Sequence, residues 1–375
     1  MSFLTGLLKS VVVVVLIVAI AIPLRYGSTD YPYLRARVAH SLLTFRYSFA
    51  SDPDRPHLTA EYRAFETLLR LRPLLADHLY ADPSQAIKLL RLHVRSNNVS
   101  PKPSECQIDK EVFVHNQHST DGFWINHPPR TFQKKIDKLL LYFHGGGYVF
   151  GDIETYRGFE CYLSQLFNMT VLHLEYRLCP EHTLPAAIED AVAIYRAILN
   201  QGVSSSQIMI MGDSAGGGLS LLTTQALLTQ QLPLPRGVIV LSPWADISIS
   251  SESYTRNKDK DVMLRFDQKE WLIEQLLGSN ASQLSADHHS VSPLFGSFEG
   301  FPSLFINVGT AETLEDDSRK VFAKAKEAKV DVTFEEGEHL MHVYPMFFGY
   351  FPEARRTLEN IRQWIQTKFD QKLNT

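Results

Sequence analysis

Cysteine is scarce in this sequence. Cys106, Cys161 and Cys179 are the three cysteines in 375 residues. They are too few and too scattered for a disulfide framework, and no CxxC pair indicates a zinc site. In an oxidising compartment, at least one of the three thiols would stay unpaired within the chain.

An excess of basic side chains is missing too. The 37 lysines and arginines stand against 41 acidic residues, which gives a net charge of -4. The chain therefore lacks the electrostatic footprint of a nucleic-acid binder, and no nucleic-acid partner is expected. No phosphate-binding loop of the G-x-x-x-x-G-K form occurs, and Asp287-His288-His289 has no third ligand at an interpretable spacing. We expect neither a metal nor a cofactor.

What remains is an ordinary globular composition, with 45% hydrophobic and 21% charged residues. This composition argues against a disordered, collagen-like or coiled-coil chain. Repeats and low-complexity segments are absent from the sequence as well. The length permits one large α/β domain or two small domains.

The N-terminal segment departs from this composition, because residues 3–24 are almost entirely apolar. Their length predicts a single membrane-spanning anchor within residues 1–25, with Lys9 reaching the interface. A cleaved signal peptide is the alternative, since Ala19-Ile20-Ala21 forms an A-x-A site. Cleavage at that site would make the protein secreted.

The orientation of such an anchor is ambiguous. Arg25, Arg35 and Arg37 follow the apolar segment and slightly favour a cytosolic catalytic domain. Three N-glycosylation tripeptides point instead to the lumen; they begin at Asn98, Asn168 and Asn280. The two signals disagree.

Residues 26–105 are expected to form a helical region, and residues 106–375 a catalytic domain. Within the second part, Val112–Val114 and Phe123–Ile125 suggest a hairpin that turns around Asp121-Gly122. Short apolar runs then alternate with helix-length segments such as 185–199 and 216–228, which predicts a mostly parallel sheet covered on both faces. The expected strands are 139–143, 170–174, 208–211, 238–241, 304–308 and 330–334.

The strongest motif is Gly212-Asp213-Ser214-Ala215-Gly216, which lies between an expected strand and an expected helix. This context is that of a nucleophile elbow, a turn too tight for side chains two residues on either side of the serine. Ser214 is therefore the candidate nucleophile.

A second motif, His144-Gly145-Gly146-Gly147, directly follows the expected strand 139–143. A glycine run there lets backbone N–H groups approach a ligand oxygen. Together with the N–H of Ala215, these glycines are candidates for an oxyanion hole.

A serine nucleophile in this fold needs an acid and then a histidine further along the chain. His342 is the candidate base, with His339 as its rival. Glu312 is the candidate acid, because it follows the end of the expected strand 304–308 by a few residues. Asp316 and Asp317 remain alternatives, although acids near a helix start have an ordinary structural explanation.

These motifs, together with Tyr176–Glu181, Pro185–Asp190 and Ser242-Pro243-Trp244, resemble the hormone-sensitive-lipase-like family of α/β-hydrolases, and within it the arylacetamide deacetylase-like members. The resemblance covers residue 111 to the C-terminus. It implies that Gly146, Gly147 and Ala215 form the oxyanion hole and that Ser214 is the nucleophile. The family pattern G-x-x-D-x-L-x-D has Glu312 at its acid position here, and Cys179 stands where the family commonly has a small residue.

The resemblance also implies a helical lid over the site and an anchor that places the catalytic domain in the lumen of the endoplasmic reticulum. Residues 250–284 could add to the lid and to an apolar acyl pocket, through Met263, Leu264, Phe266, Trp271 and Leu272.

Three functions are compatible with these residues. The first is a serine esterase acting on carboxylic esters, with amides as a further class, of apolar substrates. The second is a lipase, sterol-ester hydrolase or deacetylase, which differs in its substrate. The third is a ligand receptor on the same fold, like the plant gibberellin receptors, which lack the catalytic histidine. The presence of His342 favours an enzyme.

Overall fold

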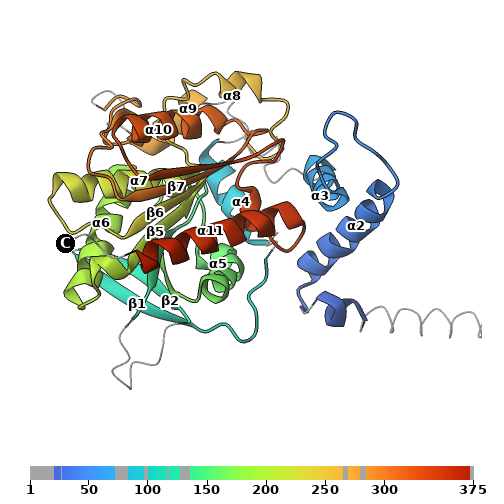
Figure 1. Cartoon of the computed structure of the whole chain (residues 1–375), viewed down its shortest axis with the longest axis horizontal. Helices are drawn as coiled ribbons and strands as arrows, with labels where there is room; N and C mark the ends of the chain where they lie inside the picture. Colours follow the sequence, from blue (N-terminus) through green and yellow to red (C-terminus); the bar gives the residue numbers. More distant parts are fainter. Residues whose placement is uncertain are drawn as a thin grey trace, which may run out of the picture.

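The computed structural model describes residues 21–26, 28–71, 83–96, 100–115, 118–126, 136–264, 269–278 and 284–371. Most of these residues form one α/β body, beside which two N-terminal helices lie (Figure 1).

A central sheet of eight strands has the order β1-β2-β4-β3-β5-β6-β7-β8. The first two pairings, β1 with β2 and β2 with β4, are antiparallel, and all the others are parallel. The mostly parallel sheet predicted from the alternating apolar runs is confirmed. The strands are β1 Ile108–His115, β2 His118–Ile125, β3 Leu139–Phe143, β4 Thr170–Glu175, β5 Ile208–Asp213, β6 Gly237–Leu241, β7 Ser303–Gly309 and β8 Val332–Gly337.

Helices cover both faces of this sheet (Figure 1). Side chains of alternate strand residues join α5 (Ile153–Phe167) and α11 (Pro352–Asp370) in one buried cluster. Those pointing the other way join α6 (Pro185–Asn200), α7 (Ser214–Thr229) and α10 (Glu315–Glu327). Burial on two faces explains why the central strands are continuous apolar runs rather than alternating ones. The remaining elements are α2 Tyr31–Tyr47, α3 Ala60–Leu71, α4 Pro83–Ser96, α8 Ser253–Arg256, α9 Lys269–Leu277 and the 3-10 turns η2 Ser205–Gln207, η4 Pro293–Phe295 and η5 Tyr344–Phe347.

The predicted hairpin exists, but its turn was misplaced. Asp121 and Gly122 lie inside β2, opposite Val112 and Glu111, and the chain reverses between His115 and His118 instead. Gly122 serves packing rather than a turn. A Cβ atom on Gly122 would lie 2.6 Å from the ring of Phe113, which occupies that space.

Helix α3 packs on the loop and turn that follow β8. Tyr62, Phe65 and Leu69 share a buried cluster with Leu340, Met341 and other residues up to position 354. The hydroxyl of Tyr62 donates a hydrogen bond to the carbonyl of His339 at 3.1 Å. The helical N-terminal region therefore reaches the segment that carries His342.

Helix α4 is joined to the loops that follow β3 and β4. The guanidinium of Arg91 donates to the carbonyls of Val149 and Cys179 at 2.7 and 3.0 Å, and pairs with Glu181 at 2.7 Å. In the segment 250–284, Leu264, Trp271 and Leu272 are partly buried against the core, while Phe266 lies outside the described residues. A lid made of these parts stays a prediction.

The expected membrane anchor needs correction. Among the described residues, no helix has both the length and the apolar character that crossing a bilayer requires. Helix α2, the first complete helix described, carries Arg35, Arg37 and Arg46. The predicted single-pass location in the endoplasmic reticulum is not borne out, and the predicted membrane partner has no support among the described residues. Residues 3–20 of the expected span lie outside the described residues.

One pair of cysteines is joined, which the sequence did not predict. A disulfide links Cys106, just before β1, to Cys161 in the middle of α5. Cys179 remains a free, buried thiol. The bond fastens the start of the sheet to the helix that covers one of its faces.

Candidate active site

The predicted elbow around Ser214 lies where β5 passes directly into α7. Ser214 has a φ of +54°, a left-handed conformation that is rare for residues other than glycine. Cβ atoms on Gly212 and Gly216 would lie 2.2 Å from the Gly216 carbonyl and 2.0 Å from the Phe143 carbonyl. Both flanking positions therefore need glycine, and the tight turn lifts the serine side chain out of the sheet.

His342 lies against this serine. Its Nε2 is 3.0 Å from Ser214 Oγ, although the two residues are 128 positions apart in the chain. His342 follows the end of β8 by five residues and is buried. An imidazole at this distance can accept the hydroxyl proton, which makes Ser214 and His342 a candidate nucleophile and base.

Glu312 approaches the other nitrogen of the same imidazole. Its Oε1 lies 3.3 Å from His342 Nδ1, and the carboxylate is fully buried. The second oxygen, Oε2, accepts from Ser242 Oγ at 2.8 Å and from the backbone N–H of Gly309 at 3.1 Å. These donors fix the carboxylate so that it can accept a hydrogen bond from Nδ1–H and hold one tautomer of the histidine.

Ser242 is a residue whose role the sequence did not reveal. Besides donating to Glu312, its Oγ accepts the backbone N–H of Val343 at 3.0 Å. One hydroxyl thus connects the candidate acid to the residue after the candidate base. A signal was available, because Ser242 directly follows β6 and therefore lies at the same edge of the sheet as Ser214.

The alternative acids are engaged elsewhere. Asp316 accepts from Arg256 at 2.6 Å and from the backbone N–H of Ser253 at 2.8 Å. Asp317 is buried under the backbone N–H groups of Ala245 and Asp246. Burial, with Asp246 nearby, raises the pKa of Asp317 to about 7. Neither carboxylate contacts His342.

His339, the rival base, also lies elsewhere. Its imidazole stacks on that of His57, with ring centroids 5.4 Å apart, and its Nε2 is 3.9 Å from Glu338. The structure therefore brings Ser214, Glu312 and His342 together and leaves His339, Asp316 and Asp317 out of this group.

The environment of His342 favours a proton on its ring. Burial lowers the pKa of this imidazole, but the Glu312 carboxylate and its hydrogen bond raise it by more, so the pKa lies above the ordinary value of 6.5. A base with a raised pKa is well suited to take up the serine proton and to carry the positive charge that results.

The glycine loop lies beside Ser214, as the candidate oxyanion hole requires. Gly146 and Gly147 have φ values of +111° and +60°, and a Cβ on Gly146 would lie 2.1 Å from the carbonyl of Phe150. Glycine is thus required by the backbone itself. Ala215, whose N–H completes the proposed set, is the second residue of α7.

Asp213 fixes this loop relative to the nucleophile. Its Oδ1 accepts from the backbone N–H of Gly145 at 3.0 Å and from Tyr142 at 2.7 Å, and its Oδ2 accepts from Tyr156 at 3.0 Å. Burial raises the pKa of Asp213 to about 6, and the hydrogen bonds limit the rise. The position of Gly145 therefore depends on the residue next to Ser214.

His144 supports the loop from behind. Its ring stacks on Tyr176 and His173, with centroids 4.2 and 5.4 Å away, and the Tyr176 hydroxyl donates to the His144 carbonyl at 2.7 Å. Burial and the neighbouring His173 lower the pKa of His144 to about 4. A neutral imidazole at this position acts in packing and not in proton transfer.

Cys179 has the properties of a structural thiol. It is buried, its Sγ lies 3.8 Å from the carbonyl of Leu276, and burial raises its pKa to about 12. A thiol that stays protonated is a poor nucleophile. The departure from the family pattern at this position therefore brings no second nucleophile.

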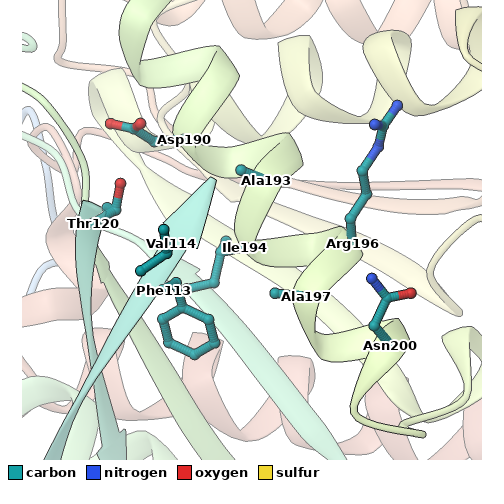
Figure 2. A pocket seen from close by; sticks show the side chains of 9 residues that line it. All are labelled: Phe113, Val114, Thr120, Asp190, Ala193, Ile194, Arg196, Ala197 and Asn200. Atoms are coloured by element: carbon teal, nitrogen blue, oxygen red, sulfur yellow. The ribbon is translucent and has the colours of Figure 1, made fainter. Parts of the chain in front are cut away.

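A groove of about 230 Å³ lies away from these residues, between α6 and the β1–β2 hairpin (Figure 2). Its charged lining residues are Asp190 and Arg196. The carboxylate of Asp190 is already paired with Arg177 at 2.9 Å. We assign no chemistry to this groove.

Comparison with known proteins gives consistent matches. A family model described as "alpha/beta hydrolase fold" matches residues 140–346. An acetyl-hydrolase of Streptomyces hygroscopicus is 36% identical over 282 residues, which cover 74% of this chain and 93% of that protein. An esterase of Acinetobacter venetianus is 33% identical over 232 residues, which cover 62% of this chain and 76% of that protein. Both organisms are bacteria, which have no endoplasmic reticulum.

Solved structures match over a larger part of the chain. The crystal structure of an esterase from the bacterial hormone-sensitive lipase family matches with a TM-score of 0.73 and 30% sequence identity. The match covers 83% of this chain and 99% of the esterase chain. The family model's range, residues 140–346, includes Ser214, Glu312 and His342.

Proposed function

Because this chain belongs to the hormone-sensitive-lipase-like family of α/β-hydrolases and is a carboxylic ester hydrolase, we propose that it cleaves short-chain acyl esters through an acyl-enzyme formed on Ser214. The observation that carries the assignment of residues is the 3.0 Å contact between Ser214 Oγ and His342 Nε2. It supplies a nucleophile and a base in direct hydrogen-bond reach.

In the first half of the reaction, His342 Nε2 takes the hydroxyl proton while Ser214 Oγ attacks the ester carbonyl. The carbonyl oxygen becomes an oxyanion, which the N–H groups of Ala215, Gly146 and Gly147 stabilise by hydrogen bonds. The protonated imidazole then gives its proton to the departing alcohol. The acyl group remains bound to Ser214.

In the second half, a water molecule replaces the alcohol. His342 takes a proton from this water as the water attacks the acyl carbonyl, and then returns the proton to Ser214 as the carboxylic acid leaves. Glu312 keeps the proton of Nδ1 in place and stabilises the imidazolium in both halves. No metal or cofactor enters this scheme.

The preference for short acyl chains is the finer part of the proposal. It is supported by the similarity to an acetyl-hydrolase that covers 74% of this chain. A preference for long acyl chains, as in a lipase or sterol-ester hydrolase, is the alternative that the experiment must separate.

The test is a panel of p-nitrophenyl esters from acetate through butyrate and octanoate to palmitate, measured with the wild type and with Ser214→Ala. We expect kcat/KM to be highest for acetate or butyrate and to fall by roughly tenfold or more for octanoate. A maximum at octanoate or palmitate would overturn the short-chain preference. Hydrolysis by Ser214→Ala at the wild-type rate would overturn the assignment of the nucleophile.

A further inference from the structure

A second cluster of reactive side chains lies on the surface near the candidate site. Among the described residues, one group of three brings together side chains that could hold a metal ion, namely His57, Glu338 and His339. Their ligand atoms all lie within 4.8 Å of one another. Neither the proposed reaction nor the core packing uses these three side chains.

The distances within the cluster are close to those of a metal site. His57 Nε2 lies 3.8 Å from one oxygen of Glu338, and His339 Nε2 lies 3.9 Å from the other. Zinc bonds of about 2.0–2.1 Å place the ligand atoms of a tetrahedron about 3.3 Å apart. The three side chains are 41–71% exposed, so small rotations can close this difference.

The chemistry of the three ligands favours zinc. Two imidazoles and one carboxylate suit Zn²⁺, whereas Mg²⁺ and Ca²⁺ prefer oxygen ligands alone. Three protein ligands leave one position of the tetrahedron for water. The exposure of the cluster lets the ion enter from solvent.

The backbone on both sides of the cluster is held in place. The N–H of His339 donates to Thr310 Oγ1 at 2.7 Å, and its carbonyl accepts the hydroxyl of Tyr62 at 3.1 Å. Near His57, the backbone N–H and hydroxyl of Thr59 both donate to Glu353 at 2.9 Å. The backbone that carries the ligands is therefore already fixed before the ion binds, which lowers the entropic cost of binding.

We propose that His57, Glu338 and His339 form a Zn²⁺ site that fastens the segment before α3 to the loop carrying His342. His339 and His342 are three residues apart, so an ion bound here would restrict the N-terminal helices and the proposed catalytic loop relative to each other. The sequence alone could not indicate this site, because His57 lies 281 residues before Glu338.

Isothermal titration of the full chain with ZnCl₂, after treatment with a chelator and desalting, tests the proposal. We expect one ion per chain, bound with a micromolar dissociation constant, and a rise in Tm on adding zinc. His57→Ala and Glu338→Gln should each weaken binding by about tenfold or more. His339→Asn should also weaken binding by removing the imidazole. Asparagine is chosen because it tolerates the φ of +58° at this position.

The matched control is the double variant His288→Ala/His289→Ala. These two exposed histidines also lie ring to ring, 4.3 Å apart, but far along the chain from His57. The control should keep wild-type zinc affinity. Binding weaker than millimolar in the wild type, unchanged binding in His57→Ala and Glu338→Gln, or loss of binding in the control alone would each overturn the site.

Discussion

The carboxylate of Asp213 accepts a hydrogen bond from the backbone N–H of Gly145 at 3.0 Å, across 68 residues of sequence. Asp213 immediately precedes Ser214, and Gly145 begins the glycine run of the candidate oxyanion hole. One buried side chain therefore sets the distance between the nucleophile and the N–H groups that would face its substrate. This relationship gives the first prediction.

Replacing Asp213 by alanine should leave the N–H of Gly145 and the hydroxyl of Tyr142 without their buried acceptor. We expect kcat to fall by roughly 10²-fold, the scale of losing one oxyanion donor, with KM changed much less. Asp213→Asn keeps an oxygen that can accept from Gly145, and it should recover at least part of the lost kcat. Steady-state kinetics of both variants measure this, and equal loss in both would contradict a positioning role.

Ser214→Ala should lower kcat by about 10⁴-fold or more, because the covalent route disappears while the fold is kept. A fluorophosphonate probe should label the wild type and fail to label the variant. Ser220→Ala is the control, since this serine lies on the same helix and its hydroxyl donates to the Gly216 carbonyl. Labelling of Ser214→Ala at the wild-type level would exclude Ser214 as the nucleophile.

Glu312→Gln should reduce kcat by several orders of magnitude, up to about 10⁴-fold, because an amide no longer holds the correct imidazole tautomer. Asp316→Asn should cost far less activity, because that carboxylate pairs with the half-exposed Arg256. Kinetics of the two variants side by side give the comparison. If Asp316→Asn is the variant that loses most of its kcat and Glu312→Gln retains turnover, the acid is misassigned.

The pH profile should report the raised pKa of His342. The imidazole must be neutral to accept the serine proton, so activity rises as pH rises through its pKa. Because Glu312 raises this pKa above 6.5, the acidic limb of kcat/KM should have its midpoint above 6.5. In Glu312→Gln the raising interaction is gone, and the residual activity should show a limb at lower pH. If the midpoint of the acidic limb is the same in Glu312→Gln and in the wild type, the interaction between Glu312 and His342 does not determine the pH profile.

Removing the disulfide should destabilise the protein without abolishing hydrolysis at room temperature. The bond closes a loop of 55 residues. For that length, the chain-entropy estimate gives at most about 4 kcal/mol of stability. Cys106→Ala/Cys161→Ala should therefore melt at a lower temperature than the wild type, and dithiothreitol should lower the Tm of the wild type but not that of this double variant. Cys179→Ala should keep the response to dithiothreitol, since Cys179 is outside the bond.

Strands β3 to β7 were predictable from the sequence because they are buried on both faces. The expected strand Leu139–Phe143 coincides with β3. The strand expected at residues 330–334 was displaced, and β8 begins at Val332. Val330 lies in the turn that ends α10, where its N–H donates to the carbonyl of Ala325 at 2.9 Å and Lys329 has a φ of +60°. Apolar periodicity does not reveal such a helix end.

The candidate site was only partly predictable. The elbow and the glycine loop are local motifs, so the spacing of their glycines indicates the backbone they form. The acid was not decided by local sequence, because Glu312, Asp316 and Asp317 all follow the same strand. In the structure, Arg256 engages Asp316 from 60 positions away in the chain. A contact of that kind is tertiary and leaves no pattern near either residue.

The packing of α3 against residues 340–354 has a consequence for how the protein is made. Tyr62 and its partner His339 are separated by 277 residues. At a synthesis rate of about 5–20 residues per second, roughly 15–55 s pass between the emergence of the helix and that of its partner. The apolar face of α3 is without its final contacts during that interval. On a ribosome, the segment with His342 is therefore among the last parts to assemble, and shielding of the early helix by a chaperone should raise the yield of active protein.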